Sequence, residues 1–145
     1  MKKLALGLLA CVALMQARAE DLNWTTDLPK AQAQAKKEDK LVLVDFTGSD
    51  WCIWCKRLTR DVFSKEEFAD YAKKNLVLVE VDFPRAKEQS QEQKKANQAL
   101  QEKYKISGYP TIIVLDKDGK QVGQLGYKDN VKDFLSELDK MKKQA

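Results

Sequence analysis

Two cysteines separated by two residues follow an apolar, strand-like segment of the chain. Cys52 and Cys55 enclose only Ile53 and Trp54, so a disulfide between them would close a loop of four residues. Stabilisation by a disulfide through chain entropy increases with loop length, which makes this bond a poor structural crosslink. Two thiols at this spacing, after a strand and at the start of a helix, form instead a reversible two-electron pair. The motif therefore indicates chemistry rather than stability.

The first 19 residues have the pattern of a secretory signal peptide. Lys2 and Lys3 precede an apolar stretch over residues 4–15, and residues 17–19 supply the small-x-small pattern that signal peptidase recognises. The apolar stretch is shorter than the about 20 residues that a membrane span needs. We therefore expect a signal peptide over residues 1–19, cleavage after it, and export of the remaining chain.

Cleavage would leave one domain, residues 20–145, with almost balanced charge. It would contain 23 basic and 22 acidic residues, a net charge of +1, so nothing predicts a nucleic-acid partner. Its length suits a single domain with a sizeable core. Cys11 is interpreted as an apolar residue of the signal peptide. Lipidation at Cys11, which would anchor the protein to a membrane, is the alternative.

The hydrophobic pattern predicts an α/β domain. A continuous apolar run at Leu41–Phe46 is typical of a parallel strand buried on both faces, and Asp118–Gly119 is typical of a hairpin turn. The predicted strands cover residues 41–46, 76–82, 111–115 and 121–125. The predicted helices cover residues 28–37, the segment after Cys52 to about 63, a segment starting at Ser64, residues 88–104 and residues 131–141.

The start of the third helix is predicted from two local signals. Ser64 and Glu67 fit a capping box, in which each side chain bonds the backbone N–H of the other residue. Phe63 and Phe68 stand where a hydrophobic staple would form across that helix start. Both signals place the helix N-cap at Ser64.

The motifs, in this order, resemble the thioredoxin-like family. They are Val44-Asp45-Phe46, Trp51-Cys52-x-x-Cys55-Lys56, Gly108-Tyr109-Pro110-Thr111 and Lys117-Asp118-Gly119. The resemblance spans residues 22–142 and is strongest to exported bacterial members, including the reductase domains of Dsb systems. It implies a thioredoxin-like fold, with a central mixed four-stranded sheet flanked by helices.

The two cysteines are expected to have different roles. Cys52 would lie at a helix N-terminus, where unpaired N–H groups and the positive end of the helix dipole favour the thiolate, so it should attack. Cys55 would lie one turn further in, buried, and should resolve the mixed disulfide. By the resemblance, Asp45 matches the family's buried acid and would exchange a proton with Cys55. The alternative for Asp45 is a strand-end carboxylate satisfied by hydrogen bonds.

Five residues are expected to bind the substrate. By the resemblance, the Tyr109–Pro110 bond would be cis and would face the cysteines, leaving the backbone of Tyr109 to pair with an extended substrate segment. Trp51, Ile53 and Trp54 make the surroundings of the thiols apolar, as in a docking patch. For Trp51, packing beneath the loop is the structural alternative.

The sequence lacks the residues that several other kinds of catalytic or binding site require. The sequence has no histidine, which excludes Ser-His and Cys-His catalysis and histidine-ligated metal sites. A second cysteine pair for zinc and a glycine-rich phosphate loop are also missing from the sequence, so we expect neither a metal nor a cofactor.

The expected function is that of an exported, periplasmic thiol-disulfide oxidoreductase. It would act as a monomer, reduce disulfides in partner proteins, and receive electrons from an upstream donor, for which a membrane thiol reductase is the candidate. The absence of histidine between the cysteines disfavours a strong oxidant. One alternative is a dedicated reductant for cytochrome c maturation. Another is a non-catalytic module that binds clients or Cu(I) and in which the cysteines are incidental.

Overall fold

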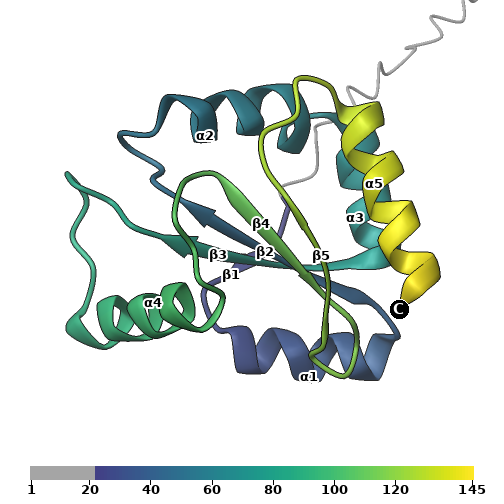
Figure 1. Cartoon of the computed structure of the whole chain (residues 1–145), viewed down its shortest axis with the longest axis horizontal. Coiled ribbons are helices and arrows are strands. Elements are labelled where there is room, and N and C mark those ends of the chain that lie inside the picture. Colours follow the sequence, from purple (N-terminus) through teal and green to yellow (C-terminus); the bar gives the residue numbers. More distant parts are fainter. Residues whose placement is uncertain (1–21) are drawn as a thin grey trace, which may run out of the picture.

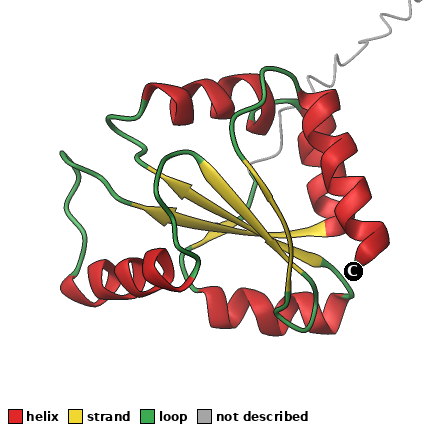
Figure 2. Ribbon diagram, viewed as in Figure 1, coloured by secondary structure: helices red, strands yellow, loops and turns green. Residues whose placement is uncertain are grey.

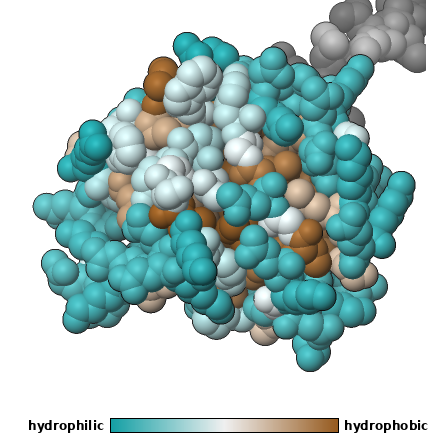
Figure 3. Space-filling view, viewed as in Figure 1, coloured by the Kyte–Doolittle hydropathy of each residue, from teal (hydrophilic) through white to brown (hydrophobic). Residues whose placement is uncertain are grey.

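A five-stranded mixed sheet forms the centre of the molecule, and helices cover both of its faces (Figures 1 and 2). The structure is a computed structural model that describes residues 22–145. The expected signal peptide and Cys11 lie outside these residues. Within residues 22–145, no helix combines the length and apolarity needed to cross a membrane. The face seen in Figure 3 is largely hydrophilic.

The elements alternate in the way that the sequence predicts. The strands are β1 (Trp24–Thr25), β2 (Leu41–Thr47), β3 (Leu76–Asp82), β4 (Thr111–Leu115) and β5 (Gln121–Leu125). The helices are α1 (Leu28–Glu38), α2 (Ile53–Leu58), α3 (Glu66–Asn75), α4 (Gln91–Lys103) and α5 (Val131–Gln144). A π-helical turn, Thr59–Phe63, continues α2 without a break.

The strand order is β1-β3-β2-β4-β5. β1 and β2 each pair with β3 in parallel, whereas β4 pairs antiparallel with both β2 and β5. β2 lies in the middle, and all seven of its residues are buried. This explains its continuous apolar run, because a central strand covered by helices meets the core on both faces.

Alternation along β2 divides the core into two layers. Leu41 and Leu43 pack on the side of α2, α3 and α5, whereas Val42, Val44 and Phe46 pack on the side of α1 and α4. Figure 1 shows these two groups of helices on opposite sides of the sheet. Because side chains along a strand alternate between the two faces, Asp45, the next odd-numbered residue of β2, must point toward α2.

The predicted fold class is confirmed, with one addition. β1 pairs Trp24 with Leu78 and Thr25 with Val79, and so adds a fifth strand at the edge of the sheet. A strand of two residues is too short to show an alternation of apolar and polar side chains, so β1 could not be predicted from the sequence. The other four strands agree with their predicted ranges to within one residue.

The prediction of a helix N-cap at Ser64 is wrong. The N-cap of α3 is Lys65, which makes no side-chain capping bond. The hydroxyl of Ser64 donates instead to the carbonyl of Arg60 (2.8 Å), because the preceding π-helical turn ends at Ser64 and leaves that carbonyl free. The rings of Phe63 and Phe68 do pack, with centroids 4.9 Å apart, so the apolar part of the signal was informative.

Candidate active site

Cys52 and Cys55 are joined by a disulfide at the N-terminus of α2. Cys52 is the N-cap residue, and its sulfur accepts a hydrogen bond from the backbone N–H of Cys55 (3.2 Å). Both cysteines are buried, while Ile53 and Trp54 between them are exposed. An N–H group aimed at the Cys52 sulfur favours a negative charge there once the disulfide opens.

A tight turn brings Cys52 to the helix start. The carbonyl of Gly48 accepts hydrogen bonds from the N–H groups of Trp51 (3.2 Å) and Cys52 (2.8 Å). A Cβ atom at position 48 would lie 2.6 Å from Cζ2 of the Trp51 ring, too close for any side chain. Glycine is therefore required here because the indole packs directly on the backbone.

Polar side chains fasten this turn to the segment after β3. The carboxylate of Asp50 accepts hydrogen bonds from the backbone N–H groups of Arg85 (3.0 Å), Ala86 (2.7 Å) and Lys87 (3.1 Å). These bonds, that of Arg85 first, hold the pKa of Asp50 below its ordinary value. The loop before the cysteines is thus fixed from a segment more than 30 residues away in sequence, which the sequence analysis missed.

Trp51 is anchored rather than free. Its Nε1 donates to the carbonyl of Phe83 (2.8 Å), the guanidinium of Arg85 lies 3.9 Å from its ring centroid, and its ring meets that of Tyr109 edge-on at 5.8 Å. Trp51 therefore makes packing contacts of the kind that the structural alternative for this residue expects. Through Tyr109, Trp51 also connects the cysteine turn to the loop that contains Pro110.

The Tyr109–Pro110 peptide bond is cis. Pro110 is buried, and the ring of Tyr109 is half-buried against Phe83, with centroids 5.4 Å apart. Its hydroxyl accepts a hydrogen bond from Nε2 of Gln101 on α4 (3.0 Å). This loop is therefore held by α4, by Phe83 and by Trp51.

Ile53 and Trp54 are the exposed apolar residues beside the disulfide. They are 58% and 47% exposed, and no other large hydrophobic side chain among the described residues is classed as exposed. The ring of Trp54 contacts both the ring of Tyr127 (centroids 5.1 Å apart) and the guanidinium of Arg57 (4.6 Å from the Trp54 centroid). Its orientation is thereby restricted, which lowers the entropic cost of binding an apolar group.

Asp45 lies on the α2 face of β2, as the alternation requires. Its side chain is 7% exposed, and its Oδ1 atom is buried without a hydrogen-bond partner. Burial, together with the nearby carboxylates of Glu80 and Asp82, raises the pKa of Asp45 to about 8. The alternative for Asp45, a carboxylate whose oxygens are satisfied by hydrogen bonds, does not hold for Oδ1.

A pocket of about 350 Å³ connects Asp45 with Cys55. It is also lined by Thr47, Ser49, Lys56, Thr59 and Glu80. Glu80 is a second carboxyl group in this pocket that the sequence analysis missed. Leu76 and Leu78 of the same strand face the α2 side, so alternation along the predicted strand 76–82 was the signal that could have placed Glu80 there.

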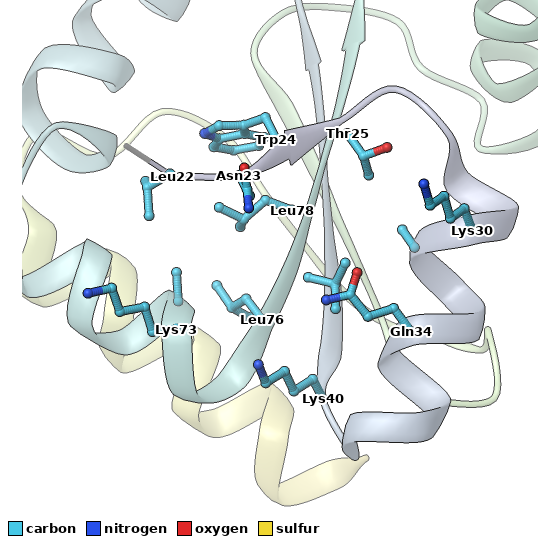
Figure 4. Close-up of a pocket in the computed structure, with 13 residues that line it drawn as sticks. Leu22, Asn23, Trp24, Thr25, Lys30, Gln34, Lys40, Lys73, Leu76 and Leu78 are labelled. Atoms are coloured by element: carbon cyan, nitrogen blue, oxygen red, sulfur yellow. The ribbon is translucent and has the colours of Figure 1, made fainter. Parts of the chain in front are cut away.

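A larger pocket lies at the β1 edge of the sheet, between α1 and α3 (Figure 4). Its volume is about 550 Å³, its floor includes Leu76 and Leu78, and Lys30, Lys40 and Lys73 stand around it. It shares no lining residue with the pocket at Cys55 and contains no cysteine. The chemistry of the chain is therefore assigned to the smaller pocket.

Replacing Asp45 by Asn should stabilise the oxidised protein in a pH-dependent way. The unfolded-state pKa of Asp is about 3.9, and the folded-state pKa of Asp45 is about 8. The folded protein therefore binds this proton more tightly, and the contribution of Asp45 to stability falls as the pH rises from about 4 to about 8. Urea unfolding across this range should show an advantage of Asp45→Asn that grows with pH.

The matched control is Asp70→Asn, which alters an exposed carboxylate on α3. Its difference from the unaltered protein should not grow with pH. An advantage of Asp45→Asn that stays constant from pH 4 to pH 8 would contradict the assigned protonation of Asp45.

Comparisons with known proteins agree with this geometry. A family model described as Thioredoxin-like domain matches residues 28–142. Disulfide bond reductase DsbH of Chlamydia pneumoniae is 35% identical over 134 residues, which cover 86% of this chain and 81% of DsbH. Thiol:disulfide interchange protein DsbD of Pseudoalteromonas atlantica is 31% identical over 105 residues, which cover 72% of this chain but only 16% of DsbD.

A solved structure named DsbH Oxidoreductase has the same fold. It superposes with a TM-score of 0.81 at 33% sequence identity and covers 91% of this chain and 94% of that structure. The family match, this superposition and the disulfide at the start of α2 lead to one conclusion. The chain belongs to the thioredoxin-like family and is similar to its Dsb-type members.

Proposed function

We propose that the chain is an exported thiol-disulfide oxidoreductase that reduces disulfides in partner proteins of the periplasm. The observation that carries the proposal is the Cys52–Cys55 disulfide at the N-terminus of α2, beside the buried carboxyl of Asp45. Thiol-disulfide exchange is the chemistry that this pair supports. The direction of electron flow, the clients and the compartment are inferred from further observations.

Cys52 is assigned as the attacking residue. In the reduced protein, its thiolate attacks one sulfur of a client disulfide; a bond forms between Cys52 and the client, and the client disulfide breaks. The electron pair of the broken bond leaves on the second client sulfur, which takes a proton. The N-cap position of Cys52 supports this role, because N–H groups of the first helical turn stabilise the thiolate.

Cys55 is assigned as the resolving residue. Its thiol gives its proton to the carboxylate of Asp45, and its sulfur then attacks Sγ of Cys52, forming the Cys52–Cys55 disulfide. The bond between Cys52 and the client breaks, and the client leaves with a second thiol. The shared pocket supports this proton transfer because both residues line it.

Reduction is favoured over oxidation on two grounds. DsbH, which is similar over most of its length, is named a disulfide bond reductase. In addition, the residues between the cysteines, Ile53 and Trp54, offer no cationic group that would stabilise the Cys52 thiolate as strong oxidants require. The similarity to part of DsbD supports a Dsb-type redox partner as the electron donor, with a membrane thiol reductase as the candidate.

Export is inferred from the signal-peptide pattern of residues 1–19. The similarity to DsbH and DsbD supports it, because a thiol reductant has clients where disulfides form, outside the cytosol. A cleaved signal peptide leads to the periplasm, whereas lipidation at Cys11 would lead to the same compartment with a membrane anchor.

Substitution of the two cysteines should separate their roles. With dithiothreitol as the electron source, Cys52→Ser should abolish reduction of insulin disulfides, because the attacking thiolate is gone. Cys55→Ser should abolish turnover as well, but should leave Cys52 in stable mixed disulfides with its partners. These are detected by non-reducing electrophoresis and disappear on reduction.

Two outcomes would contradict this assignment. Mixed disulfides in Cys52→Ser rather than in Cys55→Ser would reverse the roles. The second outcome concerns the variant in which both Cys52 and Cys55 are replaced by Ser. If this variant protects and binds clients as well as the unaltered protein does, and the unaltered protein reduces no disulfide, a binding module is favoured instead.

Trp54 should contribute to the binding of protein clients. Trp54→Ala should raise KM for insulin by at least about tenfold, because burial of a large apolar side chain contributes about 1.5–3 kcal/mol and about 1.4 kcal/mol corresponds to tenfold. The rate with a small aromatic disulfide that lacks a peptide should change little. Trp54→Phe, which retains a ring on the same backbone, is the matched control and should remain within about threefold. Equal loss with both substrates would mean that Trp54 acts on the cysteines rather than on the client.

A further inference from the structure

Asp45 and Glu80 are direct neighbours across the pairing of β2 and β3. The register of these parallel strands sets Asp45 opposite Glu80, just as Leu43 lies opposite Leu78. Paired residues of adjacent strands point to the same face, and the strands lie about 4.8 Å apart. Both carboxyl groups therefore project toward α2, side by side, at the end of the sheet nearest the cysteines.

The two carboxyl groups line the same pocket as Cys55 but differ in their access to solvent. Asp45 is almost fully buried, whereas Glu80 is half-buried. At about 350 Å³, the pocket has room for several water molecules, each of which takes about 30 Å³ in the liquid. Thr47, Ser49 and Thr59 supply further polar groups along its wall. Glu80 is thus the more solvent-accessible of the two carboxyl groups.

Three further charged residues lie near the pair: Asp82, Lys87 and Lys56. Asp82, the next residue of β3 on this face, accepts hydrogen bonds from the N–H (2.9 Å) and hydroxyl (2.5 Å) of Ser49. Lys87 donates to the hydroxyl of Ser49 (3.0 Å), and its positive charge partly opposes the rise in the pKa of Glu80 that burial causes. From α2, Lys56 lines the pocket. Within residues 22–145, neither Asp45 nor Glu80 forms an ion pair with a lysine or arginine.

Two adjacent carboxylates that form no ion pair with a cation repel each other, and one shared proton removes this repulsion. In the same direction, burial and the charge of Asp82 raise the pKa of Glu80 above its ordinary value. The buried Oδ1 atom of Asp45, which has no partner, offers a place for that proton. A pair that holds one proton next to Cys55 can act either as an acid or as a base.

We propose that Glu80 is a positioning residue that forms a proton-sharing carboxyl pair with Asp45 and exchanges this proton with solvent during each redox cycle. The inference rests on the proposed function, and it assigns to Glu80 a role in the regulation of the same site. Asp45 lines the same pocket as Cys55 and would exchange the proton with its sulfur, whereas Glu80 acts through Asp45.

The pair would serve both halves of the cycle. When a donor dithiol reduces the pair, one donor thiolate attacks Sγ of Cys52, a donor–Cys52 bond forms, the Cys52–Cys55 bond breaks, and the electron pair leaves on Cys55, which takes the proton of Asp45. The second donor thiol then attacks the donor sulfur of this mixed disulfide, and Cys52 leaves as the thiolate while the donor becomes a disulfide. When Cys55 later attacks the mixed disulfide with a client, its proton returns to Asp45. Glu80 admits a solvent proton in the first half and releases one in the second, so protons and electrons balance.

The test follows the carboxyl carbons of the oxidised full-length protein by ¹³C NMR as a function of pH. In the unaltered protein, the signal of Asp45 should titrate in two steps, because it reports the ionisation of Glu80 as well as its own. Glu80→Gln keeps the shape and removes the charge, so it should lower the main midpoint of Asp45 by roughly one pH unit. Glu102→Gln, an exposed carboxylate on α4, should leave the midpoint unchanged.

Independent single-step titrations of Asp45 and Glu80, or an unchanged midpoint in Glu80→Gln, would overturn the inference. The pH profile of insulin reduction gives a second measurement: its midpoint should shift in Glu80→Gln in the same direction and return toward the original value in Glu80→Asp. A protein that titrates as expected but reduces no disulfide would refute the proposed function and leave the carboxyl pair intact.

Discussion

The parallel pairing of β2 with β3 is the constraint on which the site depends. It places β2 in the middle of the sheet, where helices bury both of its faces, and sets Asp45 opposite Glu80 on the face covered by α2. The chain leaves β2, makes the turn at Gly48 and enters α2 with Cys52 as its N-cap residue, so Cys55 lines the same pocket as the two carboxyl groups. The redox pair and its proposed proton acceptor are thus positioned by the sheet and by the turn that Asp50 fastens.

This arrangement also explains why an uncompensated acid is retained in the core. A buried carboxyl without a cation destabilises the fold when it is ionised, and replacement by an apolar residue would remove that cost. In a thiol-disulfide enzyme, the same group can deliver and accept the proton that accompanies each electron transfer. The instability of the charged form is what places its pKa, about 8 for Asp45, near that of a cysteine thiol.

Sequence reasoning reached most of the fold because the strong signals were local and periodic. The apolar runs of β2, β3 and β4, the Asp118–Gly119 turn and the Cys52–Cys55 motif each carry their own pattern. β1 is too short for a pattern, and the capping prediction at Ser64 failed because the preceding π-helical turn offered a competing carbonyl. Alternation along β3 could place Glu80 on the α2 face, but its position opposite Asp45 depends on strand register, and the contacts of Asp50 depend on the meeting of distant segments; sequence periodicity gives neither.

The most direct test of the account is the equilibrium of the Cys52–Cys55 pair with glutathione, measured by trapping the thiols at a series of glutathione ratios. A protein that donates electrons to client disulfides must hold them less tightly than glutathione does. We therefore predict that the Cys52–Cys55 pair stays largely oxidised at a ratio of reduced to oxidised glutathione at which a pair with the same reduction potential as glutathione would be half reduced. A pair that is reduced as readily as glutathione disulfide would contradict the assignment as a reductase.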